Sequence, residues 1–172
     1  MTSLLLSSPS EPATQTIAVL LPADILDRLS KQLPGPTFPS SAVDPGYQVR
    51  QTEDKGLGLF ATRQFLQGES ITAENPALIL PFLPVGAEPP STYDALADAL
   101  DPKRRRELLE MANSQSPEEC PSDVEGIVRT NAMTLYLGLG EDKKTTYGGV
   151  YPLLNRANHR YAHDPRPTPS IH

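Results

Sequence analysis

Two glycines one residue apart, Gly56 and Gly58, form the most specific local feature of the sequence. They lie in the run Lys55–Arg63 (KGLGLFATR), and a second turn, Gly68-Glu69, follows shortly after. Because glycine lacks a Cβ, it lets the backbone turn tightly and lets a ligand approach the N–H and C=O groups. A dinucleotide fingerprint needs a third glycine and a following helix, so this run does not predict a nicotinamide or flavin site. It is either a hairpin turn or a ligand-binding turn.

Asn131 is the second feature, because it falls between Ile127 and Leu135 on the apolar face of a predicted helix. A buried side-chain amide that lacks a hydrogen bond costs about 1–3 kcal/mol. We therefore expect Asn131 to bond either a neighbouring backbone group or a ligand, and the sequence leaves both open.

The third feature is the polar run Asn155–His159 (NRANH), which follows the apolar segment Val150–Leu154. Taken alone, it is typical of a surface loop. The histidines and the single Cys120 do not form a recognisable set of metal ligands, so we predict no metal site. The basic run Lys103–Arg106 is interpreted as a solvated helix face, with a nuclear-import or anion-binding patch as the alternative.

In this order, the three features resemble the SET domain, the fold of protein-lysine methyltransferases. The run Lys55–Arg63 is similar to the opening of that domain, and Ile127–Met133 is similar to the segment after the helical insert in SET/MYND-like and fungal types. Residues 150–159 (VYPLLNRANH) resemble the family motif fP-x-x-S-R-x-N-H-S-C-x-P-N. The sequence departs from this motif after His159 and lacks the family's segment with the catalytic tyrosine, so we expect a SET-like domain that is incomplete at its C-terminus.

The resemblance implies S-adenosylmethionine as cofactor and, for an active chain, a protein substrate whose lysine side chain receives the methyl group. It leaves the catalytic residues unassigned, and without the tyrosine segment little or no methyl transfer is expected. Two alternatives stay open, a non-catalytic SET-like interaction module and an unrelated β-rich binding module. The residues to which the resemblance assigns cofactor binding are Lys55, Gly56, Leu57, Gly58, Asn131, Asn158 and His159.

Length, composition and net charge limit the number of domains, the classes of partner and the cellular location that we expect. At roughly 150 residues per domain, 172 residues predict one domain. A net charge of −6 argues against nucleic acid as a direct partner, and one cysteine excludes an intramolecular disulfide. The N-terminus has no cationic region of a signal peptide, and the apolar runs are too short to span a membrane. We expect an intracellular protein of the nucleus or cytoplasm that has no membrane partner.

The expected fold class is α+β, mostly β, SET-domain-like (β-clip), with a helical insertion and an N-terminal helical extension. Residues 1–44 are expected to be a Pro/Ser-rich extension with a short helix, and residues 45–172 a partial SET domain with an insert at about 91–121. The extension is expected to be irregular at residues 1–16 and 34–44. Alternation and turn residues predict strands at 47–51, 57–62, 70–74 and 77–83. Apolar spacing and capping residues predict helices at 22–33, 93–100, 101–112 and from 122 to about 135.

Overall fold

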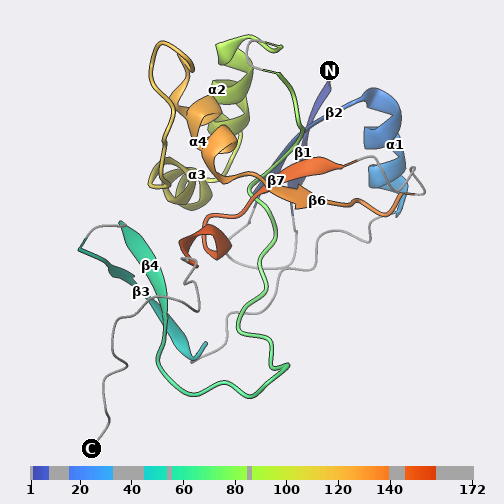
Figure 1. Cartoon of the computed structure of the whole chain (residues 1–172). Coiled ribbons are helices and arrows are strands. Elements are labelled where there is room, and N and C mark those ends of the chain that lie inside the picture. The colour runs from blue at the N-terminus through green and yellow to red at the C-terminus, as the bar shows by residue number, and fades with distance from the viewer. Residues whose placement is uncertain are drawn as a thin grey trace, which may run out of the picture.

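The computed structural model describes residues 2–7, 16–32, 45–53, 56–84, 87–139 and 146–157. These residues form a five-stranded mixed sheet with helices on both faces, and a separate two-stranded hairpin (Figure 1). The strands are β1 (Thr2–Ser7), β2 (Thr16–Leu21), β3 (Tyr47–Gln51), β4 (Leu57–Ala61), β5 (Leu78–Pro81), β6 (Met133–Leu135) and β7 (Tyr147–Val150). The helices are α1 (Ala23–Gln32), α2 (Pro90–Asp98), α3 (Pro102–Leu109) and α4 (Asp123–Asn131), followed by the short 3₁₀ helix η1 (Leu154–Arg156).

Strand β2 lies inside the five-stranded sheet, whose order is β1-β2-β5-β7-β6. It runs antiparallel to β1 and parallel to β5. Because successive side chains of a strand point to opposite faces, β2 contributes to two cores. Ala18 and Leu20 pack with residues of α2, α3 and α4, whereas Val19 and Leu21 pack with residues of α1. A strand buried on both faces reads as a continuous apolar run, which is what residues 17–21 show.

The prediction that residues 1–16 are irregular was wrong, since β1 covers residues 2–7 and β2 begins at Thr16. The Ser, Thr and Pro content of this segment gave no sign of β1 or of the start of β2. The ladder between β1 and β2 supplies the backbone hydrogen bonds that the two strands need. The predicted helix at 22–33 is confirmed as α1. The segment before residue 44 therefore adds two strands to the sheet as well as a helix. Residues 34–44 lie outside the described part of the chain.

Helices α3 and α4 begin directly after the capping residues that the sequence shows. The side chain of Asp101 accepts hydrogen bonds from the backbone N–H groups of Lys103 and Arg104, and Pro102 occupies the first turn of α3. Ser122 caps α4 by accepting from the N–H of Glu125. The predicted extension of this last helix to about residue 135 was wrong. Helix α4 ends at Asn131, and the following residues become β6, where pairing with β7 replaces helical hydrogen bonds.

The strands predicted at 47–51 and 57–62 are confirmed as the antiparallel pair β3 and β4, and the strand at 77–83 as the shorter β5. No strand forms at 70–74, so that prediction was wrong; Glu74 in this segment instead directs its side chain to α3 and η1. The α+β class is confirmed. The expectation of a mostly β fold was wrong, because the described residues contain more helix than strand.

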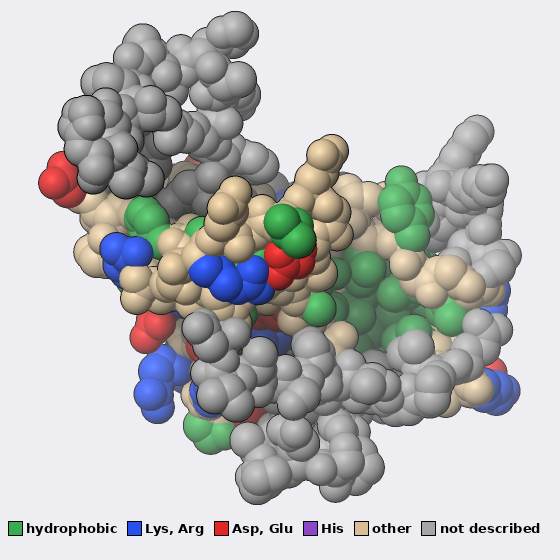
Figure 2. Space-filling view, turned by 90° about the horizontal axis from the view of Figure 1, so that it is seen from below, with side chains coloured by type: hydrophobic (Ala, Val, Ile, Leu, Met, Phe, Trp, Pro, Cys, Tyr) green, Lys and Arg blue, Asp and Glu red, His purple; other side chains and the backbone are tan. Residues whose placement is uncertain are grey.

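On the face of the molecule seen from below, the hairpin side and the α1 side carry different kinds of side chain. Seen from below, charged side chains of both signs lie over the part that carries β3, β4 and the loop after them (Figure 2). One such pair is Arg63 with Glu69, whose atoms Nη2 and Oε1 are 2.6 Å apart. Hydrophobic side chains gather on the side of α1. The hairpin therefore has charged side chains beside it and also carries exposed hydrophobic ones, Val49 and Phe60.

Replacing Leu21 with alanine tests whether β2 belongs to the cooperative core. Leu21 is fully buried in β2, so the truncation should lower the free energy of unfolding by about 2–5 kcal/mol. The matched control is Leu66→Ala, because Leu66 is 76% exposed, and its change should stay within about 0.5 kcal/mol. Urea unfolding followed by circular dichroism measures both. Equal midpoints for the two variants would contradict the central position of β2.

Candidate functional site

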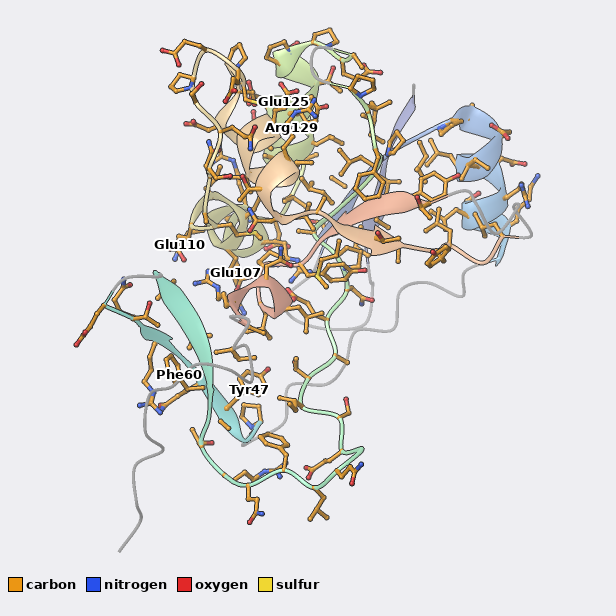
Figure 3. All side chains as sticks on the ribbon, in the orientation of Figure 1. Tyr47, Phe60, Glu107, Glu110, Glu125 and Arg129 are labelled. Atoms are coloured by element: carbon orange, nitrogen blue, oxygen red, sulfur yellow. The ribbon has the colours of Figure 1, made fainter. Side chains whose placement is uncertain are left out.

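A pocket of about 200 Å³ lies where the hairpin meets the end of α3. Gly56 and Leu57 line it from the turn and first residue of β4, and Glu110, Met111 and Ala112 line it from the segment that ends α3. Figure 3 shows Glu110 at the end of α3 that faces the hairpin. Ligand pockets in proteins usually hold roughly 300–1,000 Å³, so the described walls enclose enough space for one end of a cofactor-sized molecule.

The opposite wall comes from α4 and η1. Asn131, the last residue of α4, lines the pocket together with Pro152, Asn155 and Arg156. Strand β7 delivers this second segment, since η1 follows it after three residues. Four separate stretches of the chain thus meet at one cavity, and three of them carry the motifs that the sequence analysis singled out.

Asn131 ties these walls to one another. Its Nδ2 donates to the carbonyl oxygens of Ala112 and Ile127, both at 2.7 Å. Its own carbonyl oxygen accepts from Nδ2 of Asn155. Of the two expectations for Asn131, the structure shows the bond to neighbouring backbone, and the same residue lines the pocket. Asn131 therefore holds α4, the end of α3 and η1 in register around the cavity.

Gly56 has a φ of +69°, a left-handed conformation that side chains with a Cβ rarely adopt. A Cβ built on this residue would meet no atom within 4 Å outside the adjacent residues. The glycine is therefore required by the backbone turn, and the space beside its Cα is open. This is the arrangement that a ligand needs if it is to approach the backbone closely.

A buried ion pair supports the pocket from behind. Nη1 of Arg104 lies 3.0 Å from Oε1 of Glu74, and the two side chains are only 8% and 7% exposed. Arg104 also donates to the carbonyl oxygen of Asn75. The interpretation of Lys103–Arg106 as a solvated face was thus wrong for Arg104, which points inward while the other three cations of the run are exposed. Four consecutive residues go about once around a helix, so only some of their side chains point to the core.

The Glu74 carboxylate also holds η1. It accepts hydrogen bonds from the backbone N–H of Leu153, at 3.0 and 3.1 Å, and from that of Leu154, at 2.8 Å. These N–H groups open the turn that carries Asn155 and Arg156, and free N–H groups at such a start attract a carboxylate. Glu74 therefore joins α3 to η1 and fixes the wall of the pocket that η1 provides.

Tyr151, next to this wall, is partly buried. Burial raises the pKa of Tyr151, and the negative charge of Glu74 raises it further. The ring lies against Gly149 of β7, where an added Cβ would come within 2.7 Å of it. A larger residue at this position would force the Tyr151 ring to move.

Three comparisons of this chain with known proteins give no match. A scan against protein-family models, a search of curated proteins and a search of solved structures each find no match for this chain. Within the described ranges, no helix is long and apolar enough to cross a membrane. The same residues include no cluster of three or more His, Cys, Asp or Glu side chains that could hold a metal ion.

The residues predicted to bind a cofactor fall into three groups. Gly56, Leu57 and Asn131 meet at the pocket. Gly58 lies within β4, opposite Arg50 of β3, and is not part of the pocket wall. The remaining three, Lys55, Asn158 and His159, lie outside the described residues.

The sequence analysis missed several residues that build the site. Glu110 and Arg156 line the pocket and lie 3.5 Å apart at their closest charged atoms, while Glu74 and Arg104 lie behind it. Arg156 was inside the NRANH run, so its position in a motif was a usable signal. Glu74 and Arg104 are 30 positions apart in the sequence, and no local pattern indicates that they pair.

Replacing Arg104 with methionine tests the buried ion pair. The substitution leaves the Glu74 charge buried without its partner, and the free energy of unfolding should fall by about 3–5 kcal/mol. The matched control is Arg105→Met, one residue along, where an exposed pair with Asp98 is broken at a cost of about 0–1 kcal/mol. Chemical denaturation measures both variants. A loss for Arg104→Met no larger than that for the control would show that the pair does not stabilise the fold.

Proposed function

We propose that this pocket binds S-adenosylmethionine and that the chain is a SET-like domain of the protein-lysine methyltransferase class. The observation that carries the proposal is the meeting of the three motifs: Gly56 and Leu57 from the first, Asn131 from the second, and Asn155 with Arg156 from the third line one cavity. The three features resemble SET-domain motifs in sequence order, and the first two motifs, Lys55–Arg63 and Ile127–Met133, are separated by 63 residues.

The chemistry of the walls suits the amino-acid end of this cofactor. That end carries a carboxylate and an ammonium group, and the pocket offers the Arg156 guanidinium, the Glu110 carboxylate and the side chain of Asn155. The Oδ1 of Asn155 is buried and has no hydrogen-bond donor among the described residues. An unsatisfied buried acceptor costs about 1–3 kcal/mol, so this departure from good hydrogen bonding lies at a residue that lines the pocket. The open left-handed turn at Gly56 admits a polar ligand to the backbone.

When bound, the cofactor would supply a methyl group on a positively charged sulfur. A neutral lysine amine of a protein substrate would attack the methyl carbon in line, so that the C–N bond forms as the C–S bond breaks, S-adenosylhomocysteine leaves and the methylated ammonium gives up its proton to solvent. The described residues of this chain bind and orient one end of that molecule. Asn131 and Glu74 keep the walls in place through bonds to the backbone. The rigid positions of these groups limit the loss of conformational entropy on binding.

Titration calorimetry of the whole chain with S-adenosylmethionine tests the proposal, with a variant that fills the cavity. Ala112 lines the pocket and has an exposed side chain, so Ala112→Trp should block the site without disturbing the core and weaken binding about tenfold or more. The control is Ala95→Trp, an exposed position of α2 away from the pocket, which should bind as the unchanged chain does. Absence of binding to the unchanged chain, or equal binding by both variants, would overturn the proposal.

A second measurement separates the methyltransferase from the non-catalytic SET-like module. The chain is incubated with the cofactor carrying a labelled methyl group and with a mixed panel of histones and peptides. Label on lysine that is lost in Ala112→Trp supports transfer at this site. Calorimetric binding without any label favours the interaction module, in which the pocket holds the cofactor but no lysine reaches it.

A further inference from the structure

Arg156 and Glu110 face each other across the wall of the pocket as a loosely joined pair. Nη2 of Arg156 lies 3.5 Å from Oε2 of Glu110, which is longer than the 2.7–2.9 Å of a strong charged hydrogen bond. The Arg156 side chain is 11% exposed, whereas that of Glu110 is 52% exposed. A guanidinium that is so little exposed to water usually has a carboxylate partner closer than Glu110 is to Arg156.

The guanidinium of Arg156 has hydrogen-bonding capacity to spare. Its Nε donates to the carbonyl oxygen of Pro152 at 3.0 Å, and this bond fixes the side chain against its own turn. Toward the residues that the structure describes, the two terminal nitrogens make only the long contact with Glu110. A guanidinium carries five N–H donors in a planar fork, which matches the two oxygens of a carboxylate. The guanidinium is therefore anchored through Nε, and its terminal nitrogens can donate to a ligand.

Glu110 occupies a position that local preferences disfavour. It is the C-terminal capping residue of α3, where the unpaired carbonyl groups of the helix create a partial negative charge. A carboxylate there is repelled by the helix, while an ammonium group is attracted both by the carboxylate and by the helix end.

We propose that Arg156 binds the α-carboxylate of the ligand and Glu110 its α-ammonium group, so that the ligand replaces the contact these two side chains make with each other. The proposal rests on the proposed function, since it names the groups that select the amino-acid end of S-adenosylmethionine. The exchange is favourable because one long ion pair, half open to water, gives way to two closer pairs that the ligand shields from solvent.

Two sulfonium ligands that differ only in the carboxylate separate the two roles, and methylthioadenosine, a neutral thioether without the amino-acid chain, serves as the reference for the rest of the molecule. S-Adenosylmethionine has both charges, its decarboxylated form keeps only the amine, and methylthioadenosine has neither. In calorimetry with the whole chain, Arg156→Met should weaken binding of S-adenosylmethionine about ten- to hundredfold and leave the decarboxylated form unchanged. Glu110→Gln should weaken both amine-bearing ligands and leave methylthioadenosine unchanged.

Two further variants control for changes of shape. Arg105→Met removes an exposed cation of α3 outside the pocket and should bind all three ligands as the unchanged chain does. Arg156→Lys keeps the charge but not the fork, so its affinity for S-adenosylmethionine should lie between those of the unchanged chain and Arg156→Met. It also keeps the comparison available if Arg156→Met does not fold.

The outcomes distinguish this proposal from the one it rests on. If Arg156→Met, or Arg156→Lys in its place, weakens S-adenosylmethionine and the decarboxylated form equally, the cofactor site stands and the role of Arg156 as the carboxylate ligand is overturned. The same holds for Glu110 if Glu110→Gln binds the decarboxylated form unchanged. If the unchanged chain binds neither amine-bearing ligand, the proposed function and the present proposal both fall.

Discussion

The Glu74 carboxylate is the interaction on which the rest of the site depends. It pairs with Arg104 of α3 and accepts the N–H groups of Leu153 and Leu154, so a single buried charge fixes a loop, a helix and η1. A carboxylate and a guanidinium removed from water repay their desolvation only when their geometry is good and their remaining polar atoms are bonded. Glu74 meets this condition through its backbone donors, whereas Nε of Arg104 has no acceptor among the described residues. The arrangement therefore specifies a geometry more than it adds stability.

This constraint explains why the pocket forms where it does. The start of η1 is held toward α3, so Asn155 and Arg156 come to lie beside the residues that follow that helix. Asn131 closes the same assembly from α4 through its bonds to Ala112 and Asn155. The hairpin adds the last wall with β4, which contacts η1. The walls from α3, α4 and η1 are thus fixed to one another by polar bonds, and the hairpin wall lies in contact with η1.

Local signals predicted the elements whose ends are marked by particular residues, and they failed where long-range pairing decides. The strands of the hairpin have the predicted starts because turn glycines and alternation define them, and α3 begins where Asp101 and Pro102 place it. The strand β2 was missed because its partners, β1 and β5, are known only from the fold. The inward direction of Arg104 was missed for the same reason, since its partner lies in a distant loop. At the site, the motifs predicted Gly56, Leu57 and Asn131, while the charged pair Glu110 and Arg156 required the meeting of α3 with η1.

Departures from local preference are concentrated at this pocket. The starts of α3 and α4 follow the expected preferences, with Asp101 and Ser122 as N-terminal caps, and α4 has Arg129 in its last turn. At the pocket, an acidic residue, Glu110, caps the negative end of α3, and Oδ1 of Asn155 is buried without a donor. Each departure costs free energy, and a positively charged hydrogen-bond donor placed in the cavity would relieve the one at Glu110. Since violations of local rules occur mainly at functional sites, their coincidence at one cavity supports a cationic group as part of its ligand.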